Sequence, residues 1–285
     1  CSIRNKFDEF KAKIATFSPI VVGIVETFIN TNTRDYEKEF ALPSYKFFHG
    51  DRTRKKGGGV ALYVKSELQP VLKSASEEVI CVSVKDRLMR DIWIVVAYRP
   101  PNSNLQHDEE FYENLTGIVH NRTTILMGDF NCRNIDWTTL VGDFEGNRLL
   151  DFARENFLCQ IVNEPTRGNS MLDLVFTSDE DLLGQVRTRE NLGNSDHVTV
   201  EFDINIQHDR AVEKTNKLDY RRVDWGAMCN IVRDIDFENL NANEMWGALK
   251  ESINSAMSQC ILIIIIIIKG LFLKLHIAIL KLQIK

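Results

Sequence analysis

Six polar side chains that could bind a metal ion or transfer a proton stand beside apolar runs of the sequence. They are Glu26 after "IVVGIV", Asp129 and Asn131 at the end of "TTILMGDFN", Asp173 in "LDLVF", and Asp196 and His197 before "VTVEFDI". Apolar runs of this length, rich in β-branched residues, predict buried strands. Because α/β proteins collect catalytic groups at strand ends, we expect these side chains to converge on one site.

The chemistry of this set suits the hydrolysis of a phosphate ester. Carboxylates hold Mg²⁺ through hard oxygen ligands, and water and phosphate oxygens complete the octahedron. A histidine can transfer a proton or stabilise a phosphate, and a buried aspartate can fix the orientation of its ring. An asparagine can donate a hydrogen bond to a phosphate oxygen without adding charge. Together these groups are typical of metal-assisted hydrolysis.

Each of these residues also has a simpler structural explanation. Asp129 follows Gly128 and could be a turn residue, and Glu26 could be the N-terminal carboxylate of a helix. Asp196 and His197 could form a cap or a turn. Only their combined occurrence at strand ends favours a functional site.

The elements that must position these residues can be predicted from periodicity. Residues 3–17 place apolar side chains on one helical face, and helices are also predicted over 108–120 and 146–157. Strands are predicted over 60–64, 79–84 and 92–98, with short links that favour antiparallel neighbours, and over 160–165, 171–178 and 197–204. This order predicts two packed sheets with helices outside, across residues 1–204.

The chain changes character beyond residue 205. Residues 205–225 are polar, and 242–258 predict an amphipathic helix. The last 25 residues, "ILIIIIIIKGLFLKLHIAILKLQIK", form a low-complexity apolar tail without acidic residues. This tail has the length of a membrane span, but Lys269 and Lys274 nearly cancel the insertion free energy of its apolar residues. A membrane helix is therefore marginal, and the tail does not by itself indicate a membrane as a partner.

Charge and cysteine content narrow the class of protein. The net charge of −5 argues against a protein held on nucleic acid mainly by its overall charge, although a local basic patch could still contact DNA. Arg52, Arg54, Lys55 and Lys56 form such a run; a solvated charged surface is the alternative. The six cysteines show no metal-binding spacing, which indicates a reduced, intracellular protein.

Five motifs together resemble the endonuclease/exonuclease/phosphatase superfamily. They are "VET" (25–27), "AYRPP" (97–101), "MGDFN" (127–131), "LDLVFTS" (172–178) and "SDH" (195–197). "KGGGVALYV" and "NEPTRGNSMLDLVFTS" narrow the resemblance to the apurinic-type endonuclease domain of non-LTR (LINE-type) retrotransposon polyproteins. The resemblance covers residues 1–204, and 205–260 resemble a connector towards a reverse transcriptase.

The resemblance implies a four-layered α/β sandwich of two packed mixed β-sheets flanked by helices, and Mg²⁺-dependent nicking of DNA, with Mn²⁺ as a substitute. The implied partners are DNA and the reverse transcriptase domain of the parent polyprotein, and the implied compartment is the nucleus. Glu26 would bind the metal with Asp196 beside it, Asp129 would position or deprotonate the attacking water, and Asn131 would bind the scissile phosphate. His197 would contact that phosphate with Asp173 orienting it. Tyr98 would also contact the phosphate, and a buried strand tyrosine is its alternative explanation.

Two features depart from the family. The family has an additional strand with an asparagine upstream of the segment that matches "SIRNK", so we expect weakened nicking from residues 1–285 alone. Residues 261–285 have no counterpart in the family, and we expect them to be dispensable to its fold. Two rival functions stay open: hydrolysis of a small phosphate ester, and a catalytically impaired remnant that at most binds DNA.

Overall fold

The computed structural model describes residues 3–29, 36–50, 58–86, 89–207, 214–219, 225–233, 241–260, 262–267 and 272–281. The chain divides into two compact units. One comprises Cys1–Ile206 with Phe272–Lys285, and the other comprises Gln207–Leu271. All the candidate site residues belong to the first unit.

The first sheet of this unit has six strands. Their order is β12 (Leu183–Arg189), β13 (Thr199–Gln207), β16 (Phe272–Lys281), β1 (Val21–Val25), β3 (Val60–Lys65) and β2 (Tyr45–Gly50). Strand β1 runs parallel to β16 and antiparallel to β3. The sheet is therefore mixed.

The second sheet also has six strands. Their order is β10 (Cys159–Gln160), β11 (Asp173–Thr177), β7 (Thr124–Asp129), β6 (Asp91–Tyr98), β5 (Val79–Lys85) and β4 (Val71–Ala75). Strands β6 and β7 are parallel and are joined through helix α3 (Leu105–Val119), as parallel neighbours require a crossover connection. The other neighbouring pairs are antiparallel.

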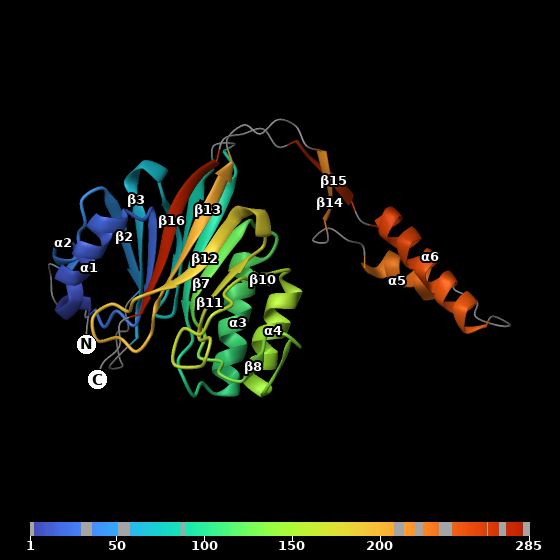
Figure 1. Ribbon diagram of the computed structural model, residues 1–285, viewed down its shortest axis with the longest axis horizontal. Helices are drawn as coiled ribbons and strands as arrows, with labels where there is room; N and C mark the ends of the chain where they lie inside the picture. Colours follow the sequence, from blue (N-terminus) through green and yellow to red (C-terminus); the bar gives the residue numbers. More distant parts are fainter. Residues whose placement is uncertain are drawn as a thin grey trace. The chain divides into compact units, whose positions relative to one another are not determined.

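The two sheets pack face to face between two layers of helices (Figure 1). Along β1, Val21 and Val25 point into the apolar layer between the sheets, whereas Val22 and Ile24 pack with helix α1 (Ile3–Phe17). Helices α3 and α4 (Phe144–Glu155) cover the outer face of the second sheet. This alternation of side chains follows from the period of two along a strand. The predicted four-layered sandwich is confirmed.

Some predicted elements differ from the structure. The run 60–64 is not a neighbour of 79–84, because β3 lies in the first sheet whereas β5 lies in the second. The predicted strand 160–165 is reduced to β10, whose partner is β11. Strands β2, β4 and β12 were not predicted, because their half-buried or exposed residues show a weaker apolar pattern. Short elements complete this unit: α2 (Tyr36–Glu39), η1 (Ser66–Leu68), β8 (Ile135–Asp136), β9 (Val141–Gly142) and η2 (Glu180–Leu182).

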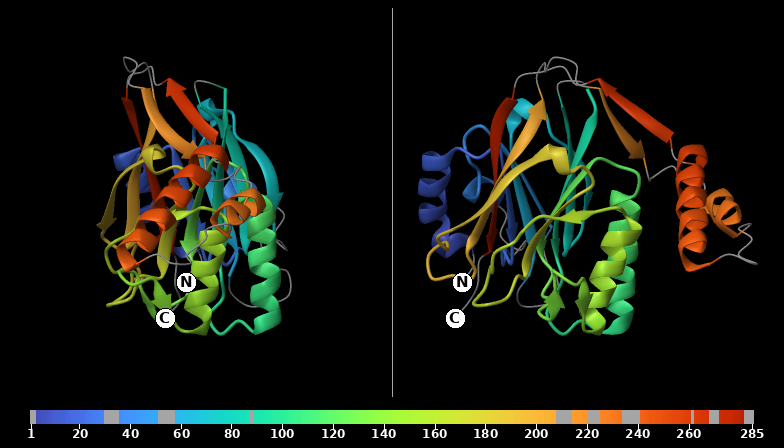
Figure 2. Two further views of the ribbon diagram at one scale, coloured as in Figure 1. Left: turned by 90° about the vertical axis from the view of Figure 1, so that its right-hand side faces the viewer. Right: turned by 45° about the vertical axis from the view of Figure 1, so that its right-hand side comes forward.

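The apolar tail was expected to be dispensable to the fold, but part of it belongs to the sandwich. Its part Phe272–Lys281 forms β16 inside the first sheet, between β13 and β1 (Figure 2). Five residues of β16, from Ile277 to Lys281, pair in register with Val21–Val25. A run rich in leucine and isoleucine can hydrogen-bond its backbone groups in a buried strand as well as in a membrane helix. Its composition alone therefore did not predict a strand.

The second unit contains two strands and two helices. Strands β14 (Lys214–Asp219) and β15 (Leu262–Ile267) form an antiparallel pair. Helix α6 (Ala242–Cys260) contains the predicted helix 242–258 and packs with α5 (Trp225–Arg233), where Ser252 Oγ donates to the carbonyl of Ile231. Among the described residues, no helix combines the length and the apolarity needed to cross a membrane.

Candidate active site

Three polar side chains form a row across the second sheet. Tyr98 of β6 is the register partner of Asp129 in β7, and Asp129 is the register partner of Asp173 in β11. Asp129 and Asp173 share their strand faces with Met127 and Val175, which point into the layer between the sheets. The row therefore lies at one end of that layer, and all three side chains are almost fully buried.

Gly128 allows this row to form. Its φ of +154° is one that side-chain-bearing residues rarely adopt, and a Cβ there would come within 1.8 Å of the carbonyl oxygen of Ala97 on β6. Any other residue would push β7 away from β6. Gly128 and Asp129 are the last two residues of β7, so the alternative explanation as a turn does not hold.

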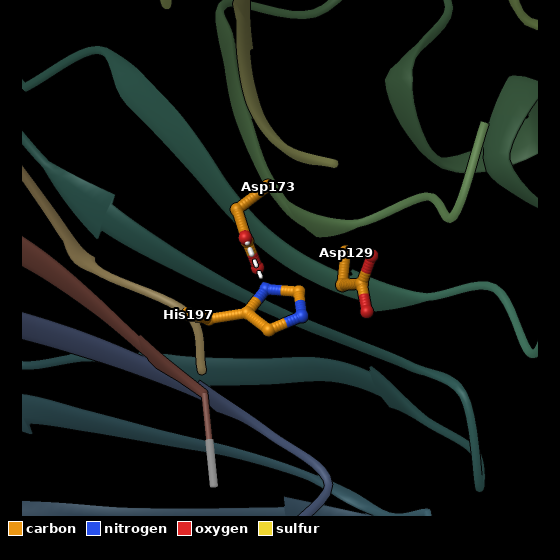
Figure 3. Close-up of side chains that lie close together, drawn as sticks. All are labelled: Asp129, Asp173 and His197. Atoms are coloured by element: carbon orange, nitrogen blue, oxygen red, sulfur yellow. Dashed lines mark hydrogen bonds and ion pairs between the residues drawn. The ribbon is translucent and has the colours of Figure 1, made fainter. Parts of the chain in front are cut away.

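His197 joins the row from the first sheet, where it lies two residues before β13. Its Nδ1 lies 2.6 Å from Asp173 Oδ2, the pairing that the family resemblance implies (Figure 3). The other ring nitrogen lies on the side of Asp129. Neither that Nε2 nor Asp173 Oδ1 has a hydrogen-bond partner among the described residues, although both atoms are buried. Such atoms in a native site are candidates for contact with a ligand.

Thr166 links the strand of Asp173 to the loop of His197. Its Oγ1 accepts hydrogen bonds from the backbone N–H groups of Leu172 and Asp173, each at 3.0 Å. Its carbonyl accepts from Val198 N at 3.0 Å. Thr166 is fully buried, and it was not singled out from the sequence because its partners are backbone groups 6, 7 and 32 positions away.

Asn131 holds the carboxylate of Asp129. Its backbone N–H donates to Asp129 Oδ1 and its Nδ2 donates to Oδ2, both at 3.0 Å. Nδ2 also donates to the carbonyl of Arg99 at 2.8 Å. A φ of +53°, which asparagine tolerates better than most residues, brings both donors to the same side. Because both amide hydrogens have protein partners here, Asn131 acts on Asp129; its contact with a phosphate stays a prediction.

Arg99 supports the segment from Asp129 to Asn131 through its backbone groups. It was not among the site residues predicted from the sequence. It is fully buried, and its guanidinium donates to both carboxylate oxygens of Asp108 at 2.8 and 2.7 Å. Burial alone would lower the pKa of Arg99, but the hydrogen bonds to Asp108 and the electrostatic effects of Asp108, Cys132 and Tyr112 together outweigh it and raise that pKa. The backbone N–H of Arg99 donates to the carbonyl of Asp129. The sequence shows Arg99 within the motif "AYRPP", but it does not show that Asp108 of α3 forms an ion pair with it.

Glu26 reaches the row from the end of β1. Strand alternation after Val25 would direct it away from the second sheet, but its φ of +56° breaks the extended conformation. Its Oε1 accepts a hydrogen bond from Tyr98 Oη at 2.8 Å. A non-glycine residue with this φ costs about 1 kcal/mol or more, and such strain persists where surrounding contacts fix it.

The glycines of "KGGGV" supply those contacts. The carbonyls of Gly59 and Gly58 accept from Thr27 N and Phe28 N at 3.2 and 3.0 Å. Gly59 has a φ of +86°, and a Cβ there would lie 2.6 Å from Thr27 Oγ1. Arg52, Arg54, Lys55 and Lys56, the predicted DNA contacts of the same segment, lie outside the described residues.

Asp196 does not join the buried group. Its carboxylate forms an ion pair with Arg167 at 2.7 Å, with about two fifths of the side chain exposed. The loop before it is held by α1, where Lys6 Nζ donates to Leu192 O at 3.1 Å and Glu9 accepts from Gly193 N at 2.7 Å. Burial lowers the pKa of Lys6, while the charges of Glu9 and Asp196 oppose that shift. Its role as a neighbour of the metal stays a prediction.

The arrangement suits a divalent cation. Asp129, Asp173 and His197 each offer one ligand atom, and these atoms lie within 4.8 Å of one another. Carboxylate oxygens are the ligands that Mg²⁺ prefers. Asp173 Oδ1 and His197 Nε2, which have no partner within the described part of the chain, are consistent with a ligand at this place. The residues present therefore fit a metal ion and a bound phosphate.

The chain is similar to known proteins in sequence and in fold. Residues 92–201 match the model of a family described as endonuclease-reverse transcriptase. The endonuclease domain of TRAS1, a telomere-specific non-LTR retrotransposon, superimposes with a TM-score of 0.55 at 19% identity, covering 69% of this chain and 91% of that one. The fold is that of the endonuclease/exonuclease/phosphatase proteins.

Two further solved structures share the endonuclease/exonuclease/phosphatase fold. The AP endonuclease LMAP from Leishmania major has a TM-score of 0.58 at 13% identity, covering 69% of this chain and 81% of its own. An endonuclease/exonuclease/phosphatase family protein from Leptotrichia buccalis has a TM-score of 0.52 at 15% identity, covering 72% and 97%. No curated protein matches the chain in sequence. The resemblance stated from the five motifs is confirmed.

Proposed function

We propose that the chain is a divalent-metal-dependent DNA endonuclease. It would hydrolyse one phosphodiester bond of its target, in the nucleus, and leave a 3′-hydroxyl that primes reverse transcription by the polymerase of the same polyprotein. The observation that supports this best is the buried Asp173–His197 pair, whose second ring nitrogen lies on the side of Asp129. The family match and the TRAS1 domain support the choice of DNA as substrate.

Asp129 is the residue that we assign to the attacking water. Both of its carboxylate oxygens accept hydrogen bonds from Asn131, which fixes the plane of the carboxylate. A carboxylate held in this way can orient a water molecule and accept its proton. Because Asp129 is fully buried, that proton transfer takes place away from bulk water.

His197 is the residue that we assign to the scissile phosphate. Asp173 accepts a hydrogen bond from Nδ1–H and fixes the ring, so that Nε2 can act on a ligand. A protonated Nε2 donates a hydrogen bond to a phosphate oxygen, where negative charge develops during hydrolysis. Donors of this kind contribute about 10²–10³ in rate in a site that excludes water.

The metal would be held by the carboxylates that these two assignments leave available. Glu26, which accepts a hydrogen bond from Tyr98 Oη, is the residue that we assign to the metal, with Asp196 as its neighbour. When bound, Mg²⁺ supplies Lewis-acid stabilisation of the phosphate, and Mn²⁺ could replace it. Tyr98 orients Glu26 through its hydroxyl and could contact the phosphate in the same site.

A supercoiled-plasmid assay tests the proposal. The protein is expected to convert supercoiled plasmid to nicked circles with Mg²⁺ and not with EDTA, and a DNA polymerase should extend the nicks directly. His197→Ala should abolish nicking, while His120→Ala, an exposed histidine at the end of α3, should leave it unchanged. Absence of nicking by wild type, or equal nicking by His197→Ala, would contradict the assignment.

The rival functions give different results in related assays. A solved structure with this fold is titled a 3′ phosphatase, so phosphate release from 3′-phosphorylated DNA should be measured in parallel. Phosphate release without nicking would favour a phosphatase. Binding of DNA in a gel-shift assay without either reaction would favour an impaired remnant.

A further inference from the structure

Arg99 is the last residue after β6 whose backbone N–H can donate to β7. Register pairing of the two strands ends at Tyr98 and Asp129, and Arg99 N donates one further hydrogen bond to the carbonyl of Asp129 at 2.9 Å. Pro100 and Pro101 follow, and proline has no backbone N–H. Any further donor from this segment to the end of β7 must therefore be a side chain.

Three groups of Arg99 contact three consecutive residues at the end of β7. Its N–H donates to Asp129 O, its Nη1 donates to the carbonyl of Phe130 at 3.4 Å, and its carbonyl accepts from Asn131 Nδ2 at 2.8 Å. Asn131 in turn donates to both carboxylate oxygens of Asp129. A displacement of Arg99 would therefore change the orientation of the carboxylate that we assign to the attacking water.

The guanidinium of Arg99 is itself fixed by two helices that cover the second sheet (Figure 1). Asp108 of α3 accepts from Nε and Nη2 at 2.8 and 2.7 Å, and Glu145 Oε2 of α4 lies 3.4 Å from Nη2. A guanidinium that donates two parallel hydrogen bonds to one carboxylate has a specific orientation. The pair therefore fixes the place of Arg99 relative to α3.

Stability alone does not account for this buried pair. The side chains of Arg99 and Asp108 are 0% and 3% exposed. Replacing a buried ion pair by apolar residues of similar volume is often neutral or stabilising, because desolvation of the charges offsets their attraction. Apolar side chains would fill the same space, but they could neither donate to the carbonyl of Phe130 nor fix one orientation through two hydrogen bonds. The pair is therefore suited to a role in geometry.

We propose that Arg99 is a positioning residue of the active site, which holds Asp129 and Asn131, through its pair with Asp108, in the arrangement that hydrolysis requires. Arg99 acts through these residues and not by contact with the substrate. The catalytic consequence rests on the proposed nuclease function. The positioning of the segment from Asp129 to Asn131 does not.

The double variant Arg99→Met with Asp108→Leu, made in the full chain, tests positioning separately from burial of charge. It leaves no unpaired charge, so the free energy of unfolding should stay close to that of wild type. We expect kcat for plasmid nicking to fall roughly 10–100-fold, as for a small misplacement of catalytic groups, with KM changed less than about twofold. The matched control, Arg154→Met with Asp151→Leu, removes an exposed pair of α4 and should change neither constant. A folded double variant with the wild-type kcat would overturn the proposal.

Hydrogen–deuterium exchange tests the positioning without any activity measurement. The amide hydrogen of Asn131, bonded to Asp129 Oδ1, reports on the segment, and that of Leu126 in the middle of β7 reports on the sheet. In the double variant, exchange at Asn131, measured by NMR, is expected to rise about tenfold relative to exchange at Leu126, because the opening is local. The wild-type ratio of the two exchange rates would overturn the proposal.

The two measurements distinguish the possible failures. If the double variant does not fold, Arg99→Lys takes its place, because lysine keeps a charge beside Asp108 but lacks the fork that reaches Asp108 and Phe130 together. It should show the same fall in kcat and the same rise in exchange, and wild-type values of both would overturn the proposal. Faster exchange at Asn131 in the variant, combined with a wild-type protein that never nicks DNA, would contradict the proposed function while confirming the positioning.

Discussion

The two sheets contribute to the site in different ways. The second sheet places Tyr98, Asp129 and Asp173 by strand register alone, at adjacent positions of three paired strands. The first sheet contributes Glu26 and His197 from loops beyond the strand ends. These loops are held by distant backbone groups, including Gly58, Gly59 and Thr166, and by helix α1.

This difference indicates how firmly each side chain of the site is held in position. A residue inside a ladder is fixed by hydrogen bonds on both sides, so moving it requires disruption of the sheet. A residue in a supported loop can move when one support is removed, while the sandwich stays folded. We therefore expect changes on the second sheet to affect chemistry or stability strongly, and changes in the loop supports to affect catalysis by smaller factors.

The largest effect is expected from Asp129→Asn. The substitution keeps the shape of a residue fixed by the ladder but removes its charge and its capacity to accept a proton. We expect kcat for plasmid nicking to fall about 10³-fold, within the range for loss of a general base. The melting temperature should stay within a few degrees of wild type. Asp151→Asn, an exposed position on α4, is the matched control. A kcat within tenfold of wild type would refute the role of Asp129.

Arg99→Met should produce the largest loss of stability. It leaves the carboxylate of Asp108 buried without its partner, and breaking such a pair costs about 3–5 kcal/mol. The free energy of unfolding, measured with urea, gives this value. The double variant Arg99→Met with Asp108→Leu should recover most of the loss, because no unpaired charge remains. Equal destabilisation in the single and double variants would show that packing, not charge, sets the cost.

Gly59→Ala is expected to weaken metal binding by Glu26, with an effect between those of Arg99→Met and Lys6→Met. The added Cβ meets Thr27 Oγ1 at 2.6 Å and a φ of +86° disfavours alanine, so the loop after Glu26 must shift. We expect the Mg²⁺ concentration for half-maximal nicking to rise about tenfold, on the order of 1.4 kcal/mol in binding. Gly117→Ala has open space around its Cβ and is the control. Unchanged metal dependence would show that Gly59 does not fix Glu26.

Lys6→Met should have the smallest effect of the series. It removes the hydrogen bond to Leu192 O that holds the loop before His197, and one such bond contributes about 1 kcal/mol. We expect kcat to fall a few-fold with little change in melting temperature. Lys11→Met, an exposed position of the same helix, should change neither. A loss as large as that of Asp129→Asn would place Lys6 in the chemistry instead of the support.

The second-sheet half of the site was the part that could be predicted from the sequence. Apolar runs ending in Asp129 and beginning at Asp173 mark strands, and strand ends meet at one edge of a sheet. The family resemblance, which rests on the order of the motifs, also implied that Asp173 pairs with His197. By contrast, the support of Glu26 by Gly58 and Gly59 depends on carbonyl positions that no periodicity encodes.

Two further features could not be predicted for physical reasons. From the sequence, Arg99 is predicted to be an ordinary exposed charged residue. It can be buried only because Asp108 of α3 lies beside it and pairs with its charge. The segment 272–281 reads as a membrane-like tail because composition does not distinguish a buried central strand from an apolar helix. Only its pairing with β1 settles that choice.

The row of Tyr98, Asp129 and Asp173 has a consequence for how correct folding can be recognised. Side chains alternate along a strand, so a slip of β7 by one residue would exchange Asp129 for Gly128 at the end of the inner layer. A slipped molecule would keep its strands and its circular dichroism spectrum, yet it would have no carboxylate at the centre of the site. Active-site titration of purified protein would therefore count correctly paired molecules that spectroscopy of secondary structure cannot tell from misregistered ones.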